Sequence, residues 1–122
     1  MFPALEAARN ALALIAGVAT CKIGIEPGIA PNDYPMIRLV PSRITPGKPY
    51  GNRSAETLVY FGAPIGAADS GDLEAVYAGL FALEESIIAA VKALGGRYIE
   101  TITDEDRLDA YKLFVVRCEL VG

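Results

Sequence analysis

The chain has 122 residues, a length that favours a single domain. Its formal net charge is −4, and this mild acidity argues against broad nucleic-acid binding, which requires a basic face. The sequence has no histidine and two cysteines, which excludes Ser-His and Cys-His nucleophiles, histidine-ligated metals and a four-cysteine zinc site. No apolar run reaches the roughly 18–20 uncharged residues that span a bilayer. We expect a globular protein that is not an enzyme and has no cofactor or metal.

The first half of the chain predicts one helix and two strands. Apolar residues recur at helical spacing from Pro3 to Gly17, and Glu6 interrupts the run, so a helix is expected rather than a secretory signal. Alternation with period two predicts a strand over Cys21–Glu26. A second strand is expected over Tyr34–Val40.

The next segment, Pro41–Glu56, is rich in proline and glycine and poor in apolar residues, so a long flexible loop is expected there. Strands are then predicted over Thr57–Ile65, Tyr98–Thr103 and Ala110–Val121. In the last strand, one face carries Phe114, Val116, Cys118 and Leu120, and the other carries Tyr111, Leu113, Val115, Arg117 and Glu119.

A long helix is predicted from Asp69 to Gly96, with Asp69 or Ser70 as its N-cap and the Gly95-Gly96 pair at its end. It is apolar over most of its circumference, because large side chains occupy one broad arc and alanine, glycine and serine occupy the opposite side. A helix that is apolar nearly all round is buried on two sides. A chain of this length has little material to cover both sides, so the pattern indicates self-assembly.

Together these elements predict an α+β fold in which residues 1–122 form one domain. Runs of strands joined by short turns favour an antiparallel or mixed sheet of about five strands, with the two helices packed on one face.

Few residues suggest chemistry. Glu84 projects into the large apolar arc of the long helix, where an ionised carboxylate needs a partner, so it is a candidate for a buried, paired charge. The acidic turn over Asp104–Asp109 is interpreted as a solvated turn rather than a cation site, because its spacing matches no calcium loop. Cys21 and Cys118 are expected to be buried free thiols rather than a disulfide.

The order of elements is similar to that of a known family. An alanine- and leucine-rich helix leads to a strand, and Asp33-Tyr34-Pro35 precedes a second strand, Met36–Val40. A Pro/Gly-rich segment, a strand, a long apolar helix that ends in glycines and a final strand follow. In this layout the chain resembles the tail terminator proteins of long-tailed bacteriophages, the group typified by the minor tail protein U of lambda-like phages.

The resemblance implies a structural virion protein, a homohexameric ring that caps the tail tube and offers a surface for joining the head. It implies no catalytic residues, and its partners would be further copies of the chain, the tail tube protein and a head-completion protein. Nucleic acid would at most pass through the ring, no membrane would be involved, and the virion tail would assemble in the bacterial cytoplasm. Eight residues are candidates for the interface with a copy or partner: Arg43, Lys48, Tyr50, Arg53, Tyr111, Leu113, Val115 and Arg117.

Two alternatives remain open from the sequence. One is a head–tail connector, or neck protein, that is monomeric until it docks. The other is a dimeric α+β module that binds a small ligand between sheet and helices. A ring subunit predicts an oligomer that dissociates, without unfolding, when Leu113 or Val115 is replaced by aspartate.

Overall fold

The computed structural model describes residues 1–47, 53–64, 70–103 and 111–122. Its elements in chain order are α1 (Phe2–Ala13), β1 (Thr20–Ile23), the 3₁₀ helix η1 (Pro31–Asp33), β2 (Met36–Thr45), β3 (Ser54–Pro64), α2 (Ser70–Ala93), β4 (Arg97–Ile102) and β5 (Tyr111–Val121).

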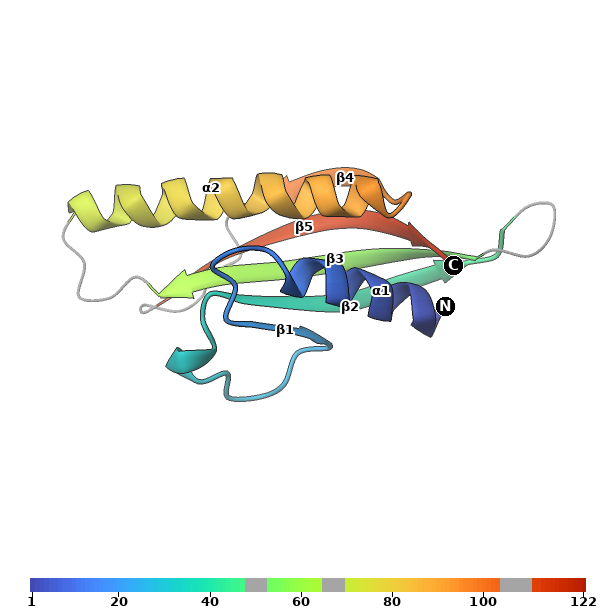
Figure 1. The fold of residues 1–122 in the computed structure, drawn as a ribbon, viewed down its shortest axis with the longest axis horizontal. Coiled ribbons are helices and arrows are strands. Elements are labelled where there is room, and N and C mark those ends of the chain that lie inside the picture. Colours follow the sequence, from blue (N-terminus) through green and yellow to red (C-terminus); the bar gives the residue numbers. More distant parts are fainter. Residues whose placement is uncertain (48–52, 65–69, 104–110) are drawn as a thin grey trace.

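The strands form one five-stranded sheet in the order β1-β2-β3-β5-β4. β1 runs parallel to β2, whereas the β2–β3, β3–β5 and β4–β5 pairs are antiparallel. The two helices cover the same face of this sheet, with α2 above β3 and β5 and α1 beside β2 (Figure 1). The predicted α+β fold with a mixed sheet and two helices on one face is confirmed.

The hydrophobic core lies between the sheet and the helices. Phe61 of β3 and Phe114 of β5 are fully buried at its centre, with ring centroids 5.6 Å apart in an edge-to-face arrangement. Three leucine or alanine residues of α1 reach this core, which agrees with the predicted apolar stripe. The core also contains Leu5, Ala8, Leu12, Ile37, Leu39, Val59, Leu80, Ile87, Val91, Val116, Cys118 and Leu120.

Backbone geometry explains where both helices end. α1 stops at Ala13, four residues before the predicted end, because a tightened last turn leads to Gly17 at φ +89°. Beyond α2, Gly95 has φ +81° and donates its N–H to Lys92, while Gly96 donates to Val91. These two bonds form a Schellman motif, so the predicted glycine stop is confirmed.

The prediction of a long loop over Pro41–Glu56 is wrong in its extent. β2 continues to Thr45 and β3 begins at Ser54, so strands occupy half of that segment. The ladder shifts register between Pro41 and Arg43, and this β-bulge accommodates the proline. The outer half of β2 is exposed, so it lacks the apolar alternation that would have indicated a strand.

Candidate functional site

Helix α2 packs on the sheet along a narrow line. Leu80, Ile87 and Val91 are buried, whereas Phe81 and Leu94 keep 47% and 42% of their surface exposed. The small residues on the outer side of the helix are all exposed: Ala75, Ala78, Gly79, Ala82, Ser86, Ala89 and Ala93. The protomer therefore covers one side of α2 and leaves the second apolar side open.

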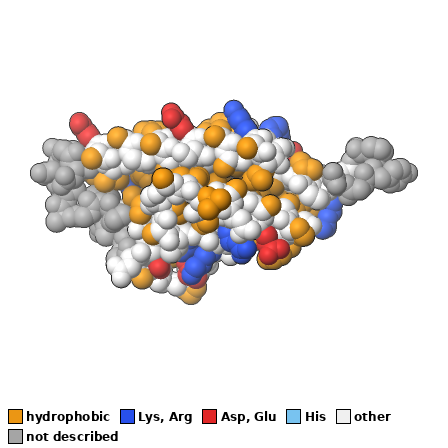
Figure 2. Space-filling model, in the orientation of Figure 1, with side chains coloured by type: hydrophobic (Ala, Val, Ile, Leu, Met, Phe, Trp, Pro, Cys, Tyr) orange, Lys and Arg blue, Asp and Glu red, His pale blue; other side chains and the backbone are white. Residues whose placement is uncertain are grey.

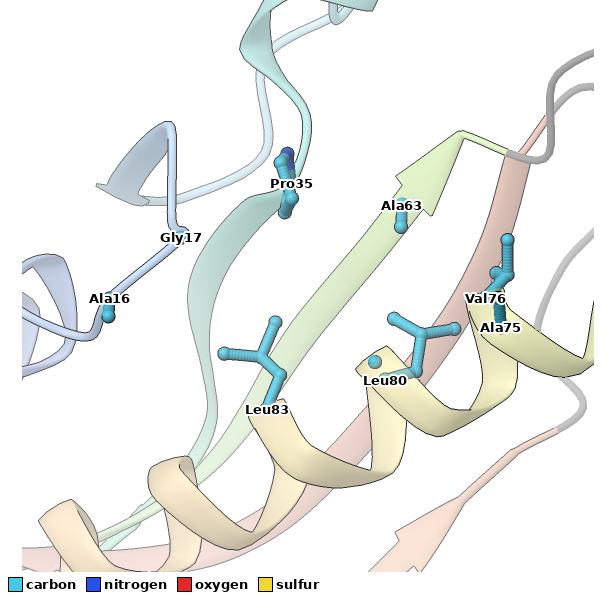
Figure 3. Close-up of a pocket in the computed structure, with 9 residues that line it drawn as sticks. Ala16, Gly17, Pro35, Ala63, Ala75, Val76, Leu80 and Leu83 are labelled. Carbon is cyan, nitrogen blue, oxygen red and sulfur yellow. The ribbon is translucent and has the colours of Figure 1, made fainter. Parts of the chain in front are cut away.

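An apolar groove borders the open side of α2. It has a volume of about 270 Å³ and lies between α2, the turn after α1 and the facing ends of β2 and β3. Leu80 and Leu83 extend from α2 toward Pro35 and Ala63 across this space (Figure 3). The described residues that line it are all apolar or glycine: Ala16, Gly17, Pro35, Ala63, Ala75, Val76, Gly79, Leu80 and Leu83. These described residues offer apolar contact, and none of them has a side chain that would orient a polar ligand.

The surface around the groove is also apolar. Hydrophobic side chains lie in a band between the two helices, and charged side chains lie along the rims of this face (Figure 2). Leu14, the residue after α1, is 86% exposed. Contiguous apolar surface of this kind marks interaction sites more often than scattered single residues do.

On the opposite face of the sheet, a buried arginine fastens the segment between β1 and β2. Arg38 of β2 is fully buried, and its Nε donates to Oε1 of Glu26 at 2.8 Å. Its Nη1 donates to Thr20 Oγ1 and to the Ile37 carbonyl, both at 2.9 Å. Thr20 in turn donates to the Asp33 carbonyl at 2.7 Å. The guanidinium thus ties β1 and the segment before η1 to the sheet.

The pairing with Glu26 is ionic as well as hydrogen-bonded. Arg38 Nη2 lies 2.8 Å from the same Oε1 but makes no hydrogen bond in the described structure, and Lys22 Nζ lies 3.4 Å from Oε2. Hydrogen bonding to Arg38 lowers the pKa of the Glu26 carboxyl below its ordinary value. A second cavity, of about 370 Å³, lies beside this cluster and is lined by Ile25, Glu26, Gly28, Ile29, Tyr34, Met36, Tyr60 and Leu113.

A second ionic cluster crosses the same face at the other end of the sheet. Arg117 of β5 donates to Glu56 of β3 and to Glu100 of β4, and Arg97 lies 3.6 Å from Glu119. The hydrogen bond from Arg117 lowers the pKa of the Glu56 carboxyl, and the charge of Arg43 lowers it further. These pairs are half-exposed, so they fix strand alignment more than they add stability.

Acidification is expected to lower the free energy of unfolding. Glu26 and Glu56 have folded-state pKa values below the ordinary 4.5, so their pairings stabilise the protein above that pH and are lost as the pH falls through the folded-state values. Urea denaturation at about pH 6, 4 and 3 measures this loss. The double substitution Glu26→Gln and Glu56→Gln should flatten the pH dependence, and an unchanged slope would contradict the assignment.

The structure does not bring into one patch those of the eight predicted interface residues that it describes. Arg43 and Arg117 both approach Glu56, and Arg53 pairs its backbone with Gly122 at the end of the β3–β5 ladder. Leu113 is half-buried beside the second cavity. Lys48, Tyr50 and the side chain of Tyr111 lie outside the described residues.

The prediction that Val115 lies at an interface with a copy or partner is wrong. It is only 2% exposed, so it cannot contact a partner without rearrangement of the protomer. It faces away from the helices, as predicted, and its ladder neighbours are Tyr60 of β3 and Ile102 of β4. Alternation along a strand predicts the face of a residue but not what covers that face.

Glu84 and the two cysteines have ordinary structural surroundings. Glu84 is half-buried, so it is not the fully buried charge that the sequence predicted. Cys118 is buried and Cys21 is half-buried, and both are free thiols. Burial raises the pKa of each to about 11, so neither is an activated nucleophile. The acidic turn over Asp104–Asp109 lies outside the described residues.

Sequence reasoning missed two features of this site. The groove draws Ala16, Gly17, Pro35 and Ala63 from three separate places in the chain, and small residues give no signal of their own. The Arg38–Glu26 pair had a detectable signal, since Arg38 interrupts the apolar run of β2 and Glu26 has the opposite charge. Their spacing of twelve residues through a turn-rich segment gave no reason to pair them.

The fold and site together define an α+β domain with an open apolar helix face. Within the described part of the chain, no cluster of side chains has the composition to hold a metal ion, and no helix has the length and apolarity to cross a membrane. Comparison with protein-family models finds none that matches the chain, and comparison with curated proteins finds no significant match.

Proposed function

We propose that this chain is a structural virion protein of a long-tailed bacteriophage: a tail terminator that forms a ring of copies of itself and caps the tail tube. We infer self-assembly because the side of α2 that carries small residues is exposed. The protomer leaves this side uncovered along a helix of 24 residues. Apolar area of this extent is removed from water only by another macromolecule.

The lining of the groove favours a protein partner over a metabolite. Ligand sites combine apolar walls with a few polar groups that fix orientation, whereas the described groove residues are apolar or glycine. The assignment to a phage tail rests on the resemblance in the order of elements. In this proposal the ring binds the tail tube protein on one side and a head-completion protein on the other, inside the bacterial cytoplasm.

Binding to the end of a tail tube tests the tail-terminator proposal. Gold-labelled protein is mixed with isolated phage heads and, separately, with tail tubes purified from a phage mutant that lacks its terminator, and labelled particles are imaged by negative stain. We expect label at one end of each tube, with a labelled protein of similar size and charge as the control. Label distributed along the tube, or absent at both ends, would contradict tail termination. Label found only on isolated heads would favour the head–tail connector.

A further inference from the structure

The second cavity lies on the face of the sheet away from α1 and α2. Met36 of β2, Tyr60 of β3 and Leu113 of β5 come to it from three adjacent strands. Successive side chains of a strand point to opposite faces, and the next residue along each of these strands packs in or against the core beneath the helices. The segment between β1 and β2 supplies the facing wall. The volume of about 370 Å³ is within the range of small-ligand sites.

The walls of this cavity differ from those of the groove beside α2 because they include an ionised group. Glu26 is the one charged residue among the described residues that line it. Its pKa lies below the ordinary value, so the carboxylate is negatively charged at neutral pH. Tyr34 and Tyr60 also line the cavity, and the face of a tyrosine ring attracts cations. These walls favour a positive ligand, because an anion would approach the carboxylate.

Two cations contact Glu26 without lining the cavity, and they treat its two oxygens differently. Arg38 takes Oε1, with Nε and Nη2 both at 2.8 Å, and its guanidinium is fully buried and out of reach of a ligand. Lys22 Nζ lies 3.4 Å from Oε2, longer than the about 2.7–2.9 Å of a charge-assisted hydrogen bond. The Lys22 side chain is 55% exposed, and such an ion pair is weak in water. A ligand cation can therefore replace Lys22 at Oε2 and leave the bonds to Arg38 in place.

We propose that this cavity binds an organic cation, an ammonium group on an apolar body, with the ammonium at Glu26 Oε2. The body would lie among Ile29, Met36 and Leu113. A ligand without a charge or a donor would cover the ionised carboxylate and leave it uncompensated, which costs free energy. The cavity and the groove beside α2 lie on opposite faces of the sheet, so this site depends neither on self-assembly nor on the tail-terminator function.

Three probes of similar shape and different charge test the ligand class. Benzylammonium, benzyl alcohol and benzoate are titrated separately into wild-type protein at neutral pH in a calorimeter. We expect the Kd of benzylammonium to be at least ~10-fold lower than that of benzyl alcohol, the effect of one hydrogen bond between charged groups. Benzoate should not bind. Equal affinity for the ammonium and the alcohol, tighter binding of benzoate, or no measurable binding of benzylammonium would overturn the proposal.

The two methionines of the chain locate the bound probe. Met36 lines the cavity, whereas Met1 lies beside Gly122 at the other end of the sheet. In the NMR spectrum of protein labelled with ¹³C at the methionine methyl groups, benzylammonium should shift the Met36 signal and leave the Met1 signal in place. A shift of the Met1 signal alone, or of neither signal, would place any binding elsewhere and overturn this site.

Three substitutions test the roles of the charges, with circular dichroism as the check on folding. Glu26→Gln keeps the size of the side chain and should reduce the preference for benzylammonium over benzyl alcohol to roughly 2-fold, the part that the tyrosine rings supply. Lys22→Met removes the competing cation and should lower the Kd of benzylammonium by about 3-fold, the effect of an exposed ion pair. Glu56→Gln changes an arginine-paired carboxylate elsewhere on the same face and is the matched control, with no change expected.

An unchanged preference in Glu26→Gln would overturn the site whatever Lys22→Met shows. If Glu26→Gln does not fold, Lys22→Met decides, and an equal or higher Kd for benzylammonium in that variant would overturn the proposal.

Discussion

Replacing Arg38 with alanine is expected to lower the free energy of unfolding by about 3–5 kcal/mol, the range for breaking a buried charged network and leaving a cavity. The substitution removes the bonds from the guanidinium to Glu26, Thr20 and the Ile37 carbonyl, and it empties a fully buried volume in the sheet. Urea denaturation followed by far-UV circular dichroism measures the change.

Two further variants locate the origin of that loss. Arg38→Met restores much of the volume without the charge, so it should recover part of the stability. Arg9→Ala removes a half-buried arginine of α1 and should change the free energy of unfolding by less than about 0.5 kcal/mol. An Arg38→Ala protein within about 1 kcal/mol of wild type would show that the segment between β1 and β2 is held by other contacts.

The substitution Val115→Asp is expected to unfold the protomer rather than only dissociate an oligomer. Val115 is 2% exposed, so the aspartate would place an unpaired carboxylate among apolar side chains at a cost of at least about 4 kcal/mol. Thermal denaturation and one-dimensional NMR distinguish loss of fold from loss of assembly.

The same strand supplies a matched control. Val121 has the same orientation in β5 as Val115, six residues further along, but it is 48% exposed. Val121→Asp should therefore leave the melting temperature of the protomer nearly unchanged. A folded Val115→Asp protomer that no longer assembles would restore Val115 to the interface and contradict the burial described above.

The sequence was most informative where burial leaves a periodic pattern. Phe114, Val116, Cys118 and Leu120 were predicted to share one face of the last strand, and all four are buried against the helices. The end of α2 was equally predictable, because glycine has a specific role in the Schellman motif. In each case the local rule, strand alternation or the glycine helix stop, and the tertiary structure require the same residues.

The sequence was misleading where an element is not buried. The outer half of β2 is stabilised by its ladder with β3 and a bulge at Pro41, neither of which leaves an apolar pattern. The groove beside α2 likewise depends on how far α2 lies from the turn after α1 and from the sheet. No local sequence pattern encodes that distance. Glu84 shows the same limit, since a helical projection gives the direction of its side chain but not how much of that side chain is covered.

The central claim, that copies of this chain cover the outer face of α2, is tested most directly by absolute mass. Multi-angle light scattering on wild-type protein over a hundredfold dilution series measures it. The account predicts a closed assembly of about six protomers whose mass stays constant until dissociation begins, as cyclic symmetry requires. The mass of a single protomer at every concentration would contradict the account.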